Sequence, residues 1–141
     1  SRYAGFTAAD AATEPWIGVN PNHVEINAAE EFDDPDSVYG FYKKLIAMRH
    51  NNATIATGEW NLIAADSEQV YSFTRTSGDD TILVIVNLTD KTAQVPAEVA
   101  QLLADGVGES QVLLSTYDAV HSVKSVARGE LARWEGVVIQ L

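Results

Sequence analysis

The stretch Val70–Val86, VYSFTRTSGDDTILVIV, determines the fold expected for this chain. Within it, the side chains of Tyr71, Phe73 and Arg75 alternate with those of Val70, Ser72 and Thr74, and such alternation is typical of a half-buried strand. Thr81–Leu88 contains a continuous apolar run, which indicates a strand covered on both faces. Between them, Ser77–Asp80 has the glycine and aspartates that favour a hairpin turn. The stretch therefore predicts two antiparallel strands joined by a tight turn.

Further short strands are predicted around this hairpin, because segments rich in β-branched and aromatic residues are separated by turn residues. They are Glu59–Ala64, Thr92–Val95, Gln111–Thr116 and Val137–Leu141. Glu98–Ala104 is either a short helix or an irregular link that ends at Asp105 and Gly106. Short strands separated by turns favour a mainly β fold class, namely a small antiparallel β-sandwich.

One helix is predicted before the strands, over Pro35–His50. Asp34 is a good N-cap, Pro35 suits the first helical position, and Asn51–Asn52 ends the periodic pattern. Apolar residues recur at spacings of three and four and define one face: Val38, Phe41, Tyr42, Leu45 and Met48. A lone amphipathic helix normally completes a larger layer. We therefore expect it to be the last piece of a domain that lies upstream.

Residues 1–33 show no sustained periodicity and are rich in Ala, Asn, Gly and Pro. The run Glu14–Asn22 contains two prolines and a glycine, which predicts an ordered, turning loop. Long loops in compact domains commonly belong to a binding or catalytic face. The candidate functional residues are therefore expected in this segment.

The composition disfavours several classes of partner. The 141 residues include 20 acidic and 9 basic ones, so the net charge is −11. Such a surface repels phosphate backbones and anionic headgroups, which disfavours nucleic acid and membranes. No apolar run approaches the roughly 20 residues that span a bilayer. Cysteine is absent, so we expect no disulfides, no thiolate chemistry and a cytoplasmic location.

Acidic side chains cluster immediately before the helix. The cluster consists of Glu30, Glu31, Asp33, Asp34 and Asp36. A calcium loop of the EF-hand type does not fit, because Pro35 or Val38 would occupy ligand positions and no glycine falls at the sixth. We interpret the cluster as acids that favour the positive end of a helix dipole, rather than as an acid/base pair.

The histidines do not have metal-ligand spacing. They are His23, His50 and His121. No serine lies in a nucleophile-elbow motif, and no glycine-rich phosphate loop is present. We predict no metal site, no cofactor and no catalytic residues in this chain.

The tryptophans offer apolar faces that could stack on sugar rings. Trp60 and Trp134 lie in the strand region and are interpreted as core or corner residues. Trp16 lies in the loop together with Asn20 and Asn22, which supply polar groups. These three residues are the candidate binding residues.

Several short segments within about the first 50 residues occur in a characteristic order and spacing. They are Ala4–Thr7, Pro15–Ile17, Val19–Asn22, Glu25–Asn27, Asp34–Val38, Tyr42–Ile46 and Arg49. Together they resemble the oligo-1,6-glucosidases and α-glucosidases of glycoside hydrolase family 13. More loosely, Leu131, Trp134, Glu135 and Val138 resemble the closing strand of that family, which commonly has a proline where this chain has Arg133.

The resemblance implies an architecture of a (β/α)₈ barrel followed by a C-terminal β-sandwich. It assigns residues 1–52 to the end of the barrel, as its last βα-loop and helix, and residues 53–141 to the sandwich. The loop Gly5–Asn27 then lies near the substrate pocket, with Trp16, Asn20 and Asn22 on its rim. Family members are retaining enzymes, with an Asp nucleophile and a Glu acid/base about 5 Å apart. Those residues precede Ser1 in the family's order, so we expect this chain alone to be inactive.

For the parent protein, the resemblance implies hydrolysis of α-glucosidic bonds in short oligosaccharides. One alternative is a glucosyl-transferring relative, such as a sucrose isomerase or trehalose synthase; another is a non-enzymatic carbohydrate-binding module. The expected partners are the barrel domain and the oligosaccharide. Because the helix face with Phe41, Tyr42 and Leu45 lacks its barrel neighbours, we also expect either self-association of the chain or a helix that folds back on the sandwich.

Overall fold

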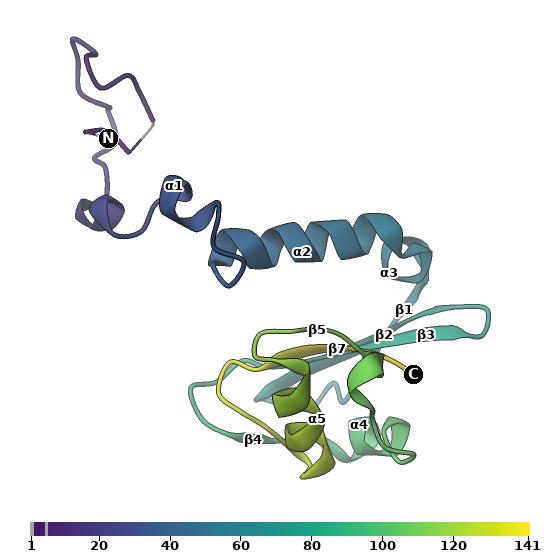
Figure 1. The fold of residues 1–141 in the computed structure, drawn as a ribbon. Coiled ribbons are helices and arrows are strands. Elements are labelled where there is room, and N and C mark those ends of the chain that lie inside the picture. The colour runs from purple at the N-terminus through teal and green to yellow at the C-terminus, as the bar shows by residue number, and fades with distance from the viewer. Residues whose placement is uncertain (1, 5) are drawn as a thin grey trace. The chain divides into compact units, whose positions relative to one another are not determined.

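The computed structural model describes residues 2–4 and 6–141, so Gly5, which belongs to the predicted rim loop, lies outside the described residues. The chain divides into two compact units, Ser1–Ile46 and Ala47–Leu141 (Figure 1). The first contains the loop and most of the predicted helix, and the second contains the strands.

The first unit contains two short helical segments that the sequence analysis did not predict. They are the 3-10 helix η1 (Pro21–Val24) and α1 (Ala28–Glu31). The Asn27 side chain begins α1 by accepting hydrogen bonds from the backbone N–H groups of Ala29 and Glu30, both at 3.1 Å. Because four-residue helices have no room for an apolar stripe, the periodic pattern could not reveal them.

The long helix α2 spans Val38–Asn51 and so begins later than predicted. Ser37, not Asp34, caps it: the Ser37 Oγ accepts a hydrogen bond from Gly40 N at 3.0 Å. Asp34 instead closes a local turn, in which its Oδ1 accepts from Asp36 N at 2.9 Å. Aspartate favours such turns as readily as caps, which explains the misplaced start. Among the described residues, no helix is long and apolar enough to cross a membrane.

The second unit is built on a five-stranded antiparallel sheet with the order β1-β2-β3-β7-β5. Its strands are β1 (Glu59–Ile63), β2 (Val70–Ser77), β3 (Asp80–Asn87), β5 (Val112–Ser115) and β7 (Gly136–Gln140). The predicted hairpin is present, with Ser77 paired to Asp80 and Gly78 at a φ of 60°. The mainly β, antiparallel fold class is therefore confirmed.

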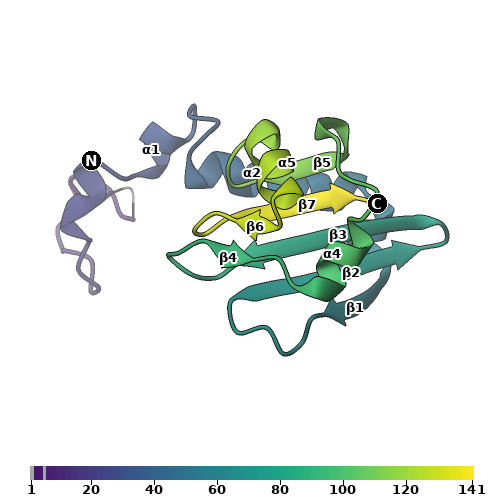
Figure 2. The same ribbon diagram turned by 90° about the horizontal axis from the view of Figure 1, so that it is seen from below.

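A smaller layer covers one face of this sheet (Figure 2). It consists of the two-stranded sheet β4 (Ala93–Gln94) and β6 (Glu130–Leu131), together with α4 (Ala97–Leu102) and α5 (Ala119–Ala127). The 3-10 helix η2 (Glu109–Gln111) leads into β5. The second layer of the sandwich is thus partly helical, and α5 and β6 were not predicted.

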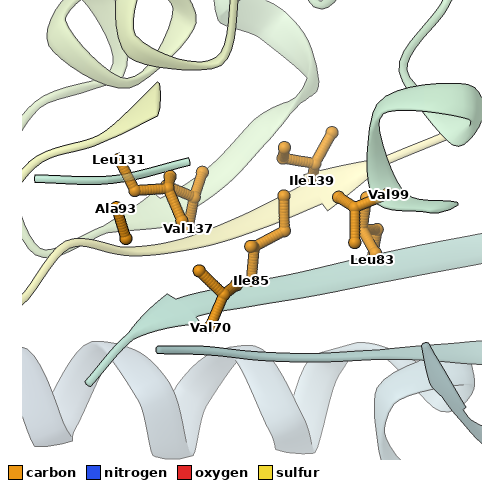
Figure 3. Close-up of a cluster of buried hydrophobic side chains, with 8 residues drawn as sticks. All are labelled: Val70, Leu83, Ile85, Ala93, Val99, Leu131, Val137 and Ile139. Carbon is orange, nitrogen blue, oxygen red and sulfur yellow. The ribbon is translucent and has the colours of Figure 1, made fainter. Parts of the chain in front are cut away.

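The hydrophobic core lies between the two layers (Figure 3). Its buried side chains are Val70, Leu83, Ile85, Ala93, Val99, Leu131, Val137 and Ile139. Fully burying one such Val, Leu or Ile side chain stabilises the fold by about 1.5–3 kcal/mol. Both β3 and β7 contribute side chains to this core, and the two strands lie next to each other in the interior of the sheet.

The opposite face of the sheet, here called the outer face, presents the larger side chains of β2. Val70, Ser72 and Thr74 point to the core and are buried, whereas Tyr71 is 43% exposed. The Ser72 hydroxyl donates to the Ile63 carbonyl at 2.8 Å, so its burial leaves no unsatisfied group. Trp60 on β1 was expected in the core, but it is 48% exposed, so that prediction is wrong.

The helix α3 (Ala53–Thr57) directly precedes β1 and contacts β2 and β3. The Thr54 hydroxyl donates to the Asp80 carboxylate, which also accepts from the Gln140 side chain. Only Gly58 separates α3 from β1. These bonds fix α3 to the hairpin end of the sheet.

Candidate functional site

The principal cavity of the first unit lies in the loop where candidate residues were expected. Its volume is about 750 Å³. The residues that line it are Phe6, Thr7, Thr13, Glu14, Pro15, Trp16, Ile17, Gly18, Val19 and Asn20. A cavity of this size lined mainly by apolar and aromatic groups is suited to a small organic ligand.

Trp16 is the most exposed large side chain of the cavity, at 95%. Phe6 and Ile17 beside it are also exposed. An exposed indole ring offers a flat apolar surface, on which the C–H face of a sugar ring can stack.

Asn20 lines the same cavity, and its side chain also organises the loop. Its Oδ1 accepts a hydrogen bond from Asn22 N at 3.2 Å and so begins η1. Its backbone carbonyl lies 2.9 Å from Nδ1 of His23. The local conformation therefore explains both why Asn20 stands here and how it is held.

Asn22 is not among the residues that line the cavity. Its backbone carbonyl accepts hydrogen bonds from Glu25 N and Ile26 N, both at 2.9 Å. The structure thus brings Trp16 and Asn20 together, and places Asn22 in η1 next to them.

Glu14, which was not among the predicted binding residues, contributes a carboxylate to the cavity lining. One of its oxygens lies 3.5 Å from a guanidinium nitrogen of Arg2, and both side chains are largely exposed. An ion pair in this setting contributes little to stability. The sequence could have indicated Glu14 as a candidate, because it directly precedes Pro15 and Trp16.

The acidic cluster before α2 has a structural role in this unit. The Glu31 carboxylate accepts a hydrogen bond from Tyr39 N in the first turn of α2, at 3.0 Å. This is the interaction that favours acids at a helix N-terminus. Among the described residues, no group of three or more His, Asp or Glu side chains is arranged to hold a metal ion.

Comparison with known proteins gives the family. The catalytic-domain model of α-amylase matches residues 1–58. The oligo-1,6-glucosidase of Parageobacillus thermoglucosidasius is 36% identical over 143 residues, which cover 100% of this chain and 24% of that protein. The oligo-1,6-glucosidase of Bacillus cereus is 35% identical over 118 residues, which cover 82% of this chain and 19% of that protein.

A solved structure extends the similarity to the fold. The trehalulose synthase MutB from Pseudomonas mesoacidophila MX-45 is 32% identical, with a TM-score of 0.75. The match covers 99% of this chain and 23% of that enzyme. The chain belongs to glycoside hydrolase family 13, the α-amylase family, as the resemblance indicated. It spans about a quarter of the length of the relatives that it matches.

Proposed function

We propose that this chain is the C-terminal part of an α-glucosidase that hydrolyses α-glucosidic bonds in short oligosaccharides by a retaining mechanism. The observation that supports this most is the 36% identity to an oligo-1,6-glucosidase over the whole chain. In the proposed protein, residues 1–52 complete the barrel and residues 53–141 form the C-terminal domain. Both catalytic carboxyl groups lie on the upstream polypeptide, so the chain alone has no hydrolytic activity.

In this proposal the loop cavity is part of the substrate-pocket rim. Trp16 stacks on a sugar ring, and Asn20 and Asn22 offer amide groups to its hydroxyls. The exposure of Trp16 and the place of Asn20 in the same cavity support this role. The partners are then the barrel domain and the oligosaccharide. The cysteine-free, acidic composition accords with a cytoplasmic enzyme.

The test uses the full-length product of the gene, purified beside the 141-residue chain. Isomaltose and a chromogenic α-glucoside are the substrates, and glucose release is measured. We expect turnover by the full-length protein and none by the short chain. A full-length protein that turns over no α-glucoside and no sucrose would refute the proposal, and sustained turnover by the short chain would refute its division of roles.

A second candidate function is isomerisation of sucrose by glucosyl transfer. The similarity to trehalulose synthase supports it, at 32% identity over 99% of this chain. Product analysis with sucrose distinguishes the two functions, because a hydrolase releases equal amounts of glucose and fructose. An isomerase instead yields mainly another disaccharide.

A further inference from the structure

The corner between β6 and β7 (Figure 2) contains Trp134 in a backbone conformation that suits few residues. Its φ is 55°, in the left-handed region that glycine adopts freely and a residue with a bulky side chain adopts only at a cost. Burial in the core does not explain a tryptophan here, because Trp134 is 57% exposed. A strained residue that the core does not require points to a role for its side chain.

Two fully buried polar side chains fix the shape of this corner. The Asn87 Nδ2 donates hydrogen bonds to the Ala132 carbonyl at 2.8 Å and to the Lys91 carbonyl at 2.7 Å. It therefore joins the corner to the loop that follows β3. The Glu135 carboxylate accepts a hydrogen bond from Ala132 N at 2.7 Å. Strained backbone persists where the surrounding structure determines the conformation in this way.

The backbone of Trp134 is also held directly. Its N–H donates to the Thr89 carbonyl at 3.0 Å, and its carbonyl accepts a hydrogen bond from Thr116 Oγ1 at 3.2 Å. The exposed indole ring therefore extends from a fixed backbone. An aromatic side chain anchored in this way loses little conformational freedom when a ligand covers it, which favours binding.

A second aromatic ring, that of Tyr117, lies against the same corner. Its hydroxyl donates to the Arg133 carbonyl at 2.9 Å, and the His121 ring stacks on it with centroids 4.4 Å apart and planes at 14°. Tyr117 is 42% exposed although its hydroxyl and one ring face are engaged. Arg133, which directly precedes Trp134, is exposed and carries hydrogen-bond donors.

The charges at this corner favour a neutral ligand. The net charge of −11 disfavours an anionic one, and the Arg133 guanidinium disfavours a cationic one. A pyranose sugar is neutral and matches both kinds of group that the corner exposes. Its apolar C–H face can stack on an aromatic ring, and its hydroxyls can accept hydrogen bonds from the guanidinium.

We propose that this corner, with Trp134, Tyr117 and Arg133, is a second sugar-binding site, and that its ligand is a neutral α-linked glucose oligomer. The choice of sugar rests on the proposed function, in which such oligomers are the substrate. The corner belongs to the second unit, whereas the loop cavity with Trp16 belongs to the first. Two weak sites of this kind retain a longer oligomer better than one site does. A second copy of this chain is the competing occupant.

Native gel electrophoresis in the presence of dextran, an α-1,6-linked glucose polymer, provides the first test. The 141-residue chain carries W16A, so that stacking in the loop cavity does not contribute. We expect dextran to lower the mobility of this variant about twofold, relative to a protein without affinity for dextran. W16A/W134G should not be retarded, whereas W16A/W60A, which lacks an exposed tryptophan elsewhere, should be. Equal retardation of W16A and W16A/W134G, or none of either, would overturn the proposal.

Thermal unfolding of the 141-residue chain separates binding from a structural role of the ring. Glycine adopts the left-handed conformation without strain, so W134G relieves the backbone as it removes the ring. We expect W134G to melt no more than about 2 °C below the parent chain, while dextran binding is lost. A fall of more than about 5 °C would assign the ring to packing and overturn the proposal.

Sedimentation velocity tests the competing occupant. If W134G abolishes a concentration-dependent dimer and dextran retards neither variant, the ring belongs to a contact between copies and the proposal fails. We expect W134G to leave the sedimentation of the chain unchanged.

These results are separable from the test of the proposed function. Isomaltose hydrolysis by the full-length protein, without retardation of the W16A chain by dextran, would refute the corner site and leave the activity intact. Retardation that depends on Trp134, in a protein whose full-length form turns over no α-glucoside, would support the corner site and refute the function.

Discussion

The Ser122 hydroxyl donates a hydrogen bond of 2.7 Å to Oε1 of Glu135, a carboxylate that is fully buried. Its Oε2 accepts from Ala132 N, also at 2.7 Å. Ser122 belongs to α5, and Glu135 directly precedes β7, so one side chain joins the helical layer to the large sheet. His121 lies 3.7 Å from the same carboxylate.

Replacement of Glu135 by alanine is expected to destabilise the second unit strongly. The change removes the acceptor for Ala132 N and for Ser122 Oγ, which keeps only its contact with Ser115 Oγ at 2.7 Å, and a buried donor left unsatisfied costs about 1–3 kcal/mol. Urea unfolding of the 141-residue chain measures the loss. Glu68→Ala, at an exposed position, is the matched control and should lie within about 0.5 kcal/mol of the parent. Equal stability of the two variants would show that the buried bonds contribute little.

Gly58→Ala is expected to disturb the junction between α3 and β1. An added Cβ would lie 2.5 Å from the Thr54 carbonyl oxygen and 2.9 Å from the Thr76 carbonyl oxygen. Because backbone atoms cannot move aside cheaply, we expect a loss of about 1–3 kcal/mol in the free energy of unfolding. Gly108→Ala meets only ordinary contacts and serves as the control. Unaltered thermal unfolding of Gly58→Ala would contradict the described geometry.

Trp16→Ala in the full-length protein is expected to weaken substrate use without loss of stability. The ring is 95% exposed, so its removal costs the fold little. Loss of sugar stacking should lower kcat/KM for isomaltose about tenfold, which corresponds to about 1.4 kcal/mol. Steady-state kinetics and the melting temperature are measured together. Trp60→Ala, an exposed tryptophan of the second unit, should leave kcat/KM unchanged.

Self-association of the 141-residue chain is expected through α2. Val38, Tyr42 and Ile46 follow one another at intervals of four residues and are all exposed. Such an apolar stripe favours contact with a second apolar surface. Sedimentation velocity should show a concentration-dependent dimer, which the double change Tyr42→Gln and Ile46→Gln weakens. Lys43→Gln, between them, should not weaken it; a parent chain that stays monomeric at high concentration would refute this prediction.

The sequence predicted the strands well, because each of the longer ones has its own pattern. Ile82–Val86 is apolar without interruption, and Gly78 marks the turn before it. The alternation in β2 predicted two faces but could not say which is buried. Ser72 turned out to point inwards because its hydroxyl finds the Ile63 carbonyl, which is a contact between strands and not a property of the segment.

Features that depend on distant parts of the chain were missed. The strand β6 has two residues and exists only because it pairs with β4. Trp134, which was expected in the core, is 57% exposed; it has a φ of 55° and its backbone N–H donates a hydrogen bond to the Thr89 carbonyl. Such positions are set by tertiary contacts that local patterns do not contain.

Part of the candidate site, in contrast, was predictable, because it depends on residues that are neighbours in the sequence. Trp16 and Asn20 lie close together in sequence and line one cavity, so the sequence brought them together. Glu14 was missed, because only the folded loop places its carboxylate in the lining of that cavity.

The short passage from α3 into β1 also decides how this region can be separated from its neighbours. A linker of one residue is too short to be cut or replaced without disturbing its neighbours. The hydrogen bond from Thr54 to Asp80 also ties α3 to the hairpin end of the sheet. A domain boundary placed at the start of β1 would therefore separate α3 from the sheet to which it is hydrogen-bonded. An independently expressed version should therefore begin before Asn52, whose side chain accepts a hydrogen bond from Ile55 N at 2.9 Å and starts that helix.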